Sequence, residues 1–372
     1  MRYRRLPIEI ESPEQFGYDR IRHNLAESSV RDLVLGDLAP DLPERLAGLV
    51  LAYGDHLGLP GLRDRIGALW SVPADAVIVT PGAATALFLV NTTCIRPADH
   101  VVIARPNYAT NVETPRAIGA EVTFLDGTWE TGWRVTPVQV AAAMTDRTTL
   151  VSLTTPGNPT GAVIPEAELH AIVEIVERHP SARLLLDETY RDLSFGARTT
   201  PGVALSDRVI SVSSLSKAYG IPGIRIGWLA TRDADLFETL LAAKEQIVIA
   251  NSVVDETIAL VALEGRDRWL PRLLEGVVTA RDTVAAWIDD SPFEWIPPQG
   301  GAVGFPRIKP DVDLDIDRFY AGLFEDHGTV VGPGHWFEQS RRSFRLGFGW
   351  PTTSELGGGL RALSRAVEDA RV

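Results

Sequence analysis

Cysteine is almost absent from this chain of 372 residues, which contains a single one, Cys94. An intrachain disulfide is therefore impossible, and we expect the protein in the reducing environment of the cytoplasm. Cys94 lies in the apolar run TALFLVNTTC, where a thiol is more typical of core packing than of nucleophilic catalysis.

Long hydrophobic runs are also missing. The chain contains no stretch of about 18 uncharged apolar residues, so the sequence predicts no transmembrane helix. The N-terminal stretch MRYRRLPIEIESPEQ has basic residues but no apolar region behind them, unlike a secretory signal. We expect no membrane partner.

Basic residues are fewer than acidic residues, which gives a formal net charge of -13. Phosphate backbones are bound by basic surfaces, so this balance argues against nucleic acid as the main partner. A local pocket for one phosphate or carboxylate remains compatible with it. Repeats and low-complexity blocks are missing as well, which leaves an ordinary globular composition.

Helix-like and strand-like segments alternate through the first two thirds of the chain. The predicted strands cover residues 76–80, 100–104, 121–125, 150–154, 183–187, 208–213 and 224–231, and the predicted helices cover 62–70, 82–93, 108–118, 137–144 and 166–178. Short apolar strands alternating with helices predict an α/β fold with a mainly parallel, doubly wound sheet that is covered on both faces.

The pattern changes beyond residue 234. Residues 234 to about 281 are almost all helical, and the remainder mixes helices with short strands at 301–306, 329–331 and 343–347. We therefore predict an N-terminal arm over residues 1–50, a large α/β domain over 51–270 and a smaller α+β domain over 271–372.

The residues that follow the predicted strands indicate a ligand site, because doubly wound sheets bind ligands at the carboxyl ends of their strands. A helix start there favours an anion, and a lysine in a pocket of low dielectric can lose its proton and form an imine. Each feature alone also fits a plain helix start, a rigid turn or a helix cap. The residues are Gly82, Ala83, Ala84, Tyr108, Asn158, Asp187, Tyr190, Ser214 and Lys217.

Together these residues form the set that pyridoxal phosphate requires. The order and spacing of five motifs resemble those of fold-type I, class I/II aminotransferases, from about Asn24 to the end of the chain. The motifs are YGDHLGLPGLR (53–63), TPGNPTG (155–161), DETY (187–190), SLSKAYGIPGIRIGW (214–228) and FRLGFG (344–349). One departure is Thr155, which stands where the family usually has asparagine.

The resemblance implies roles for the catalytic residues. Lys217 resembles the lysine that forms an imine with the cofactor and then moves a proton between the substrate Cα and the cofactor. Asp187 is similar to the partner of the pyridine nitrogen, and Tyr108 to the aromatic residue that stacks on the ring. Tyr190 and Asn158 resemble the pair that hydrogen-bonds the cofactor O3′, and Asn158 also borders the substrate.

The same resemblance implies how the phosphate is bound. Gly82, Ala83 and Ala84 correspond to the backbone that surrounds the phosphate. Ser214 is expected to supply a hydroxyl, and Arg225, placed within the predicted strand 224–231, a guanidinium. We expect no metal.

One further arginine and one further tyrosine complete the implied site. Arg345 resembles the arginine that binds the substrate α-carboxylate. Tyr53 resembles the tyrosine that reaches the phosphate of a neighbouring subunit, which implies a homodimer with composite active sites. Trp336 and Phe337 are expected to line the pocket.

The resemblance implies ping-pong transamination between an L-amino acid and a 2-oxo acid. Glu27 replaces a glycine of the segment that borders the substrate, as in a subgroup near capreomycidine and enduracididine biosynthesis, so an arginine-derived substrate is favoured. Glu27 could equally be a helix-capping or surface acid. Cyclisation, elimination and oxidation use the same cofactor site and stay open, whereas a regulator would need a DNA-binding domain for which the chain has no room.

Overall fold

The computed structural model describes residues 1–196 and 198–372. A seven-stranded sheet forms the large domain, with the strand order β2-β8-β7-β6-β5-β3-β4. Neighbouring strands are parallel except for β8, which runs antiparallel to β2 and β7. The strands are β2 (Val77–Thr80), β3 (His100–Arg105), β4 (Glu121–Asp126), β5 (Thr148–Thr154), β6 (Arg183–Asp187), β7 (Val209–Ser214) and β8 (Gly227–Thr231).

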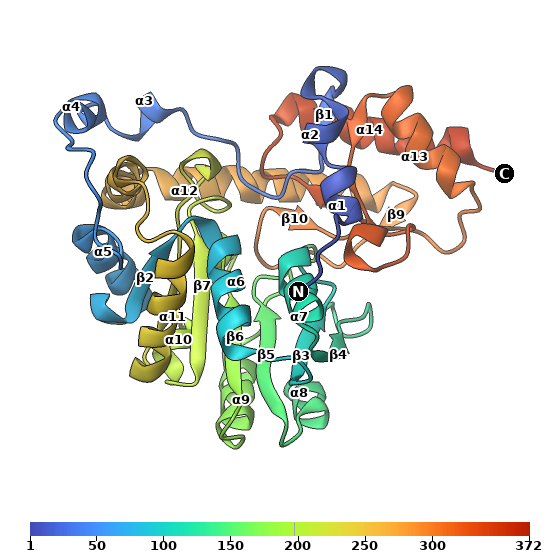
Figure 1. The fold of residues 1–372 in the computed structure, drawn as a ribbon. Helices are drawn as coiled ribbons and strands as arrows, with labels where there is room; N and C mark the ends of the chain where they lie inside the picture. The colour runs from blue at the N-terminus through green and yellow to red at the C-terminus, as the bar shows by residue number, and fades with distance from the viewer. Residues whose placement is uncertain (197) are drawn as a thin grey trace.

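Helices cover both faces of this sheet because its strands are apolar on both sides. Val101 and Ile103 of β3 pack against one layer of helices, whereas Val102 between them packs against the other. This alternation follows from the pleat of the strand. One layer contains α6 (Gly82–Cys94), α7 (Ala109–Ile118) and α11 (Ala234–Ile247), and the other contains α8 (Pro137–Ala143), α9 (Glu166–Glu177) and α10 (Gly202–Leu205) (Figure 1).

A smaller α+β domain follows at the C-terminal end. Its strands are β9 (Phe293–Glu294), β10 (Val303–Gly304), β11 (Arg307–Ile308), β12 (Thr329–Val330), β13 (Gly332–Pro333) and β14 (Phe344–Gly347), and its helices are α13 (Ile316–Glu325) and α14 (Thr353–Ala370). The 37-residue helix α12 (Val253–Asp289) runs from the large domain to the small one (Figure 1). The boundary expected at residue 270 falls inside α12, beside Pro271.

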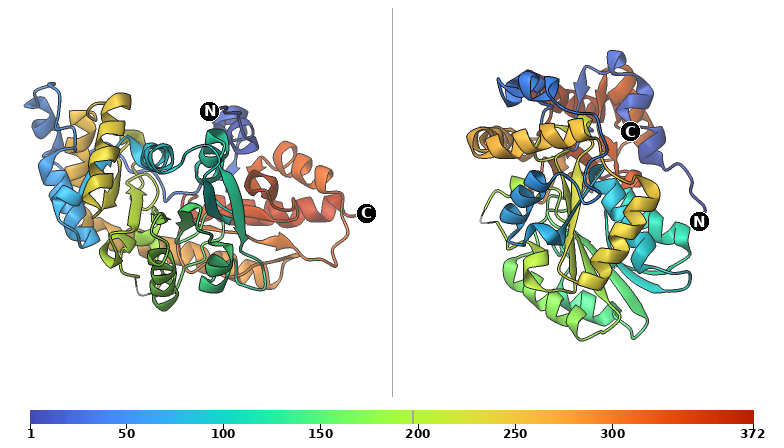
Figure 2. Two further views of the ribbon diagram at one scale, coloured as in Figure 1. Left: turned by 60° about the horizontal axis from the view of Figure 1, so that its bottom comes forward. Right: turned by 60° about the vertical axis from the view of Figure 1, so that its left-hand side comes forward.

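The N-terminal arm is distributed over both domains. Strand β1 (His23–Asn24) pairs in parallel with β12, which attaches the arm to the small domain. Two short helices precede β1, namely α1 (Pro7–Ile10) and α2 (Pro13–Phe16). Helices α3 (Leu35–Leu38), α4 (Leu42–Ala47) and α5 (Pro60–Trp70) follow it, and α3 and α4 lie at the end of the molecule opposite to α14 (Figure 2).

The predicted fold class is confirmed, but one predicted strand was wrong at its beginning. The run 224–231 becomes regular β8 only at Gly227. A short 3-10 turn, η4 (Pro222–Ile224), precedes it, and Arg225 adopts a left-handed conformation with φ 48°. Pro222 has no backbone N–H for a sheet ladder, so the apolar pattern could not extend the strand over this turn.

No helix of the described residues is both long and apolar enough to cross a bilayer.

Candidate active site

A cavity of about 340 Å³ lies where the carboxyl ends of the large-domain strands face the small domain and the N-terminal arm. Most of the residues predicted from the sequence line it. They are Glu27, Ala83, Ala84, Tyr108, Asn158, Asp187, Tyr190, Ser214, Lys217, Arg225 and Arg345, together with Trp336. Segments far apart in the sequence therefore converge on one space.

One end of the cavity is built for an anion. Helix α6 begins at Gly82, and the start of a helix directs unpaired backbone N–H groups outwards. Gly82 has φ +80°, a backbone conformation that favours glycine, and the end of the Arg225 side chain lies close to the place a Cβ would occupy. The Arg225 guanidinium also donates to the Ser216 hydroxyl at 3.4 Å. Ser216 lines the cavity and was missed in the sequence, although it stands next to Lys217.

Lys217 lines the cavity, after the end of β7. Burial lowers the pKa of its amine, and the charges of Arg345 and Arg225 lower it further, whereas Glu27 and Asp32 raise it. A lowered pKa increases the neutral fraction of the amine, which is the nucleophilic form.

Asp187 ends β6 and is buried without a cationic partner among residues 1–196 and 198–372. The Thr189 N–H and hydroxyl donate to its Oδ1 at 3.1 and 2.6 Å, and the Asn111 amide donates to its Oδ2 at 3.3 Å. Burial raises the pKa of Asp187 above its ordinary value, and these donors oppose that shift. A buried carboxylate of this kind favours a cationic ligand beside it.

Arg345 lies opposite, on β14 of the small domain, and is also buried. Its Nη1 donates to the Asn158 side-chain oxygen at 3.1 Å and its Nη2 to the Ala26 carbonyl at 2.7 Å. Its Nε has no partner within the described part of the chain. A buried guanidinium with a free N–H suits a carboxylate. The Phe337 ring lies 5.2 Å from the guanidinium carbon, which fixes its plane.

Tyr190 is buried, and burial raises its pKa to about 12. Its hydroxyl donates to the Ser28 carbonyl at 2.7 Å. Because a carbonyl can only accept, the Tyr190 lone pairs remain available for a donor in the cavity.

Residues 24–33, here called the strap, hold the two domains together across the cavity. Besides the Ala26 and Ser28 contacts, Val30 N–H donates to the Lys217 carbonyl at 3.1 Å, and Gly347 N–H donates to the Leu25 carbonyl at 2.7 Å. The strap therefore contacts the lysine turn and the arginine strand through backbone groups. Glu27 lies in this extended strap, half-buried and lining the cavity, so it is not a helix cap.

The N-terminal arm adds two acidic residues that the sequence did not identify. Glu9 and Glu14, from α1 and α2, line the cavity together with Glu27. Tyr18 lies beside Glu14 and Glu27; burial, with the charge of Glu27 next, raises its pKa to about 12. Nothing in the sequence pattern indicated these glutamates, because they lie far from any strand end.

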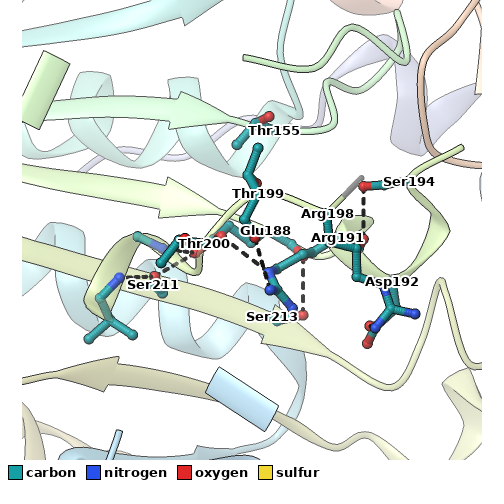
Figure 3. Close-up of polar contacts among 12 residues, drawn as sticks. Thr155, Glu188, Arg191, Asp192, Ser194, Arg198, Thr199, Thr200, Ser211 and Ser213 are labelled. Carbon is teal, nitrogen blue, oxygen red and sulfur yellow. Dashed lines mark hydrogen bonds and ion pairs between the residues drawn. The ribbon is translucent and has the colours of Figure 1, made fainter. Parts of the chain in front are cut away.

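A second buried carboxylate, Glu188, follows Asp187 in the chain, and Figure 3 shows its polar contacts. The Ser211 hydroxyl donates to it at 2.5 Å and the Gly202 N–H at 3.2 Å, and the Arg191 Nε is 4.0 Å away. Burial raises the pKa of Glu188 to about 7. It does not line the cavity, so we assign it no contact with a ligand.

Several residues that the sequence analysis named lie outside the cavity lining. Phe337 was expected to line the pocket but is buried behind it against Phe305, and Gly82 precedes the lining residues Ala83 and Ala84 at the start of α6. Tyr53 is 85% exposed, with no place in the cavity of its own chain. Cys94 is also remote from it, and burial raises the pKa of its thiol to about 11, which agrees with a packing role.

The residues present fit pyridoxal phosphate. The α6 N-terminus with Arg225 suits the phosphate, Asp187 suits a protonated pyridine nitrogen, and Lys217 suits the aldehyde. Comparison with known proteins decides the family, because residues 22–363 match the family described as aminotransferase class I and II. The chain belongs to this family.

The relatives agree with that assignment. The chain is 31% identical over 361 residues to capreomycidine synthase from Streptomyces vinaceus, covering 94% of this chain and 91% of the relative. It is 32% identical over 310 residues to arginine–pyruvate transaminase from Pseudomonas aeruginosa, covering 79% and 77%. A PLP-dependent aminotransferase from Streptococcus suis superposes with a TM-score of 0.92 at 29% identity, covering 100% of both chains. This class I/II aminotransferase is a pyridoxal-phosphate-dependent enzyme of fold type I.

Proposed function

We propose that this aminotransferase exchanges the amino group of a guanidino amino acid, derived from arginine, with a 2-oxo acid. The observation that carries the proposal is that Lys217, Asp187 and Arg345 line the same cavity. Three glutamates, here called the rim, also line it: Glu9, Glu14 and Glu27. When bound, pyridoxal phosphate supplies an electron sink that makes the substrate Cα proton removable.

The chain's own residues perform the binding and the proton movements. The guanidinium of Arg345, which lines the cavity, would bind the α-carboxylate and orient the Cα–H bond towards Lys217. The neutral Lys217 amine would take the proton from the substrate Cα and hold it for return. Asp187 would keep the ring nitrogen of the cofactor protonated, and Tyr190 and Asn158 would bind its ring oxygen. Tyr108 would hold the ring by packing.

The rim favours a cationic side chain. The cations that line the cavity are Lys217, Arg225 and Arg345, and each already has a role in this scheme. The remaining charged groups at the rim are Glu9, Glu14 and Glu27, which would repel a dicarboxylic side chain and attract a guanidinium. The relative that is named an arginine–pyruvate transaminase supports this substrate class.

The partners follow from the same proposal. The exposed Tyr53 has a role only if a second copy of the chain brings its phosphate site near it, so we propose a homodimer with composite active sites. We also propose a cytoplasmic location. The domain boundaries at residues 50 and 270 stay predictions.

A steady-state experiment tests the reaction type. Initial rates with L-arginine and related guanidino amino acids, at several pyruvate or 2-oxoglutarate concentrations, should give parallel double-reciprocal lines. Intersecting lines, or turnover that needs no oxo acid, would contradict transamination.

Cyclisation, elimination or oxidation of an arginine derivative is the second candidate. It is supported by the relative that is named a synthase rather than a transaminase. Oxygen consumption or ammonia release without an oxo acid would favour it over transamination.

A further inference from the structure

A buried polar network, separate from the cavity, joins the two turns that carry Lys217 and Tyr190. Asp192 lies two residues after Tyr190, in the 3-10 turn η3 (Arg191–Leu193), and Tyr219 lies two residues after Lys217. The Tyr219 hydroxyl donates to Asp192 Oδ2. Asp192 therefore fixes the second turn to the first by one side-chain contact.

Helix α12 supplies the third member of the network. Arg266 donates from Nη2 to Asp192 Oδ1 at 2.7 Å and from Nε to the Tyr219 hydroxyl at 3.3 Å. The Trp269 ring, one turn later on α12, packs edge-on against the Tyr219 ring with centroids 5.7 Å apart. Arg198, which is partly exposed, pairs with Asp192 at 3.1 Å (Figure 3). The network thus connects both catalytic turns to the helix that leads into the small domain.

The charges of this network are costly to bury. Asp192, Tyr219 and Arg266 are all buried, and taking an ion pair out of water costs free energy that its attraction does not always return. Apolar residues of similar shape would often give a protein of equal stability. Stability alone therefore gives no reason for a carboxylate at this position, whereas fixed directional contacts between two turns do.

Within residues 1–196 and 198–372, the side-chain hydrogen bonds that join these two turns directly or through α12 involve Asp192 and Tyr219. On the other side, the strap contacts both through its backbone, at Ser28 with Tyr190 and at Val30 with Lys217. The two turns are therefore held from opposite sides, by the strap and by Asp192.

We propose that Asp192, through Tyr219 and Arg266, is a positioning residue that sets the geometry of Lys217 relative to Tyr190. This proposal rests on the roles proposed above for Lys217 and Tyr190. Asp192 touches neither the cavity nor a ligand, so its effect is transmitted by the backbone of the two turns.

The test compares Tyr219→Phe with the wild-type enzyme loaded with pyridoxal phosphate. The substitution removes one hydroxyl and keeps the ring packing, so the protein is expected to fold. Two properties are measured well below the melting temperature: the midpoint of the pH titration of the cofactor's visible absorption band, and kcat and KM for the amino acid. We expect the midpoint to move by about half a pH unit or more, and kcat to fall about tenfold while KM changes less than about threefold.

Asp192→Asn is the second variant, with the same expected direction. Asp233→Asn is the matched control, because Asp233 pairs with Arg183 at 2.5 Å at the opposite end of β6. It should lower the melting temperature without moving the midpoint. An unchanged midpoint and kcat in Tyr219→Phe, with only a lower melting temperature, would overturn the positioning role.

A failure of the proposed function gives a different result. If the visible band of the wild-type enzyme persists unchanged in Lys217→Ala, the assignment of Lys217 is wrong and the positioning proposal falls with it. If the band requires Lys217 but is indifferent to Tyr219, only the positioning proposal is wrong.

Discussion

Two buried side chains lack the partners that their charges require, and these define the site at the scale of single residues. Asp187 has no cation beside it in the described chain, and the Nε of Arg345 has no acceptor there. Unpaired buried charges are unfavourable, so each is best explained by a ligand group of opposite charge. A protonated ring nitrogen and a substrate carboxylate meet both needs.

Glu188 gives a prediction about pH and stability. Its pKa is about 7 in the folded protein, against an ordinary value of 4.5. Between these values the folded state binds more protons than the unfolded chain, so the Glu188 contribution to the free energy of unfolding falls as pH rises through this window. Glu188→Gln removes this contribution. Between pH 5 and pH 8 the wild-type protein should lose more free energy of unfolding than the variant, by on the order of 3 kcal/mol.

Urea unfolding midpoints at both pH values measure the Glu188→Gln effect. Glu174→Gln is the control, because Glu174 lies exposed on α9 with only a long contact to Arg178 at 3.7 Å. Equal pH dependence in Glu188→Gln and the wild type would show that Glu188 does not titrate in this range.

The sequence predicts the residues that line the cavity at the strand ends better than the residues that support them. Asp187 and Lys217 follow strands in motifs, so their positions could be recognised. Asn111 donates to Asp187 from a helix 76 residues earlier in the chain. Glu14 lines the cavity from a short helix that the hydrophobic periodicity of the sequence does not predict. Contacts of this kind depend on tertiary packing, which local patterns do not contain.

At the scale of elements, the fold was predictable where strands and helices alternate. The apolar strands of the large domain stand out because they are buried on both faces. Arg225 was assigned to a strand because the residues around it are apolar. In the structure these residues form a turn, where Pro222 and the left-handed conformation of Arg225 interrupt the strand. The two-residue strands of the small domain are too short for any periodicity.

The strap and α2 together give the prediction on substrate choice. Glu14 and Glu27 face the cavity from these two elements. Glu14→Gln and Glu27→Gln should each lower kcat/KM for L-arginine by about tenfold, since each removes one charge partner of the guanidinium. The value for a neutral amino acid such as L-alanine should change much less.

Glu174→Gln on the outer helix α9 is again the matched control and should leave both substrates unaffected. An unchanged preference for L-arginine over L-alanine in the double variant of Glu14 and Glu27 would contradict the guanidino substrate.

At the scale of the whole molecule, Tyr53 tests the composite site. The proposed dimer places its hydroxyl on the phosphate of the other subunit. Tyr53→Phe should therefore weaken cofactor binding by about tenfold, the effect of losing one hydrogen bond to a charged group. Equilibrium dialysis of pyridoxal phosphate gives the dissociation constant, and sedimentation gives the oligomeric state.

Tyr3→Phe is a control for loss of an exposed tyrosine hydroxyl, since Tyr3 contacts only Met1 in the described residues. A monomeric wild-type enzyme, or a Tyr53→Phe variant that binds the cofactor as tightly as the wild type, would contradict the composite site.

A single half-reaction at Lys217 tests the proposed transamination most directly. Loaded wild-type enzyme is mixed with L-arginine without any oxo acid, and the visible spectrum and the products are followed. We predict conversion of the aldehyde form of the cofactor to its amine form, one oxo acid released per site, and recovery of the original spectrum on adding pyruvate. Lys217→Ala should show none of these changes. Oxygen consumption or ammonia release in place of that conversion, or Lys217→Ala reacting at the wild-type rate, would contradict the proposal.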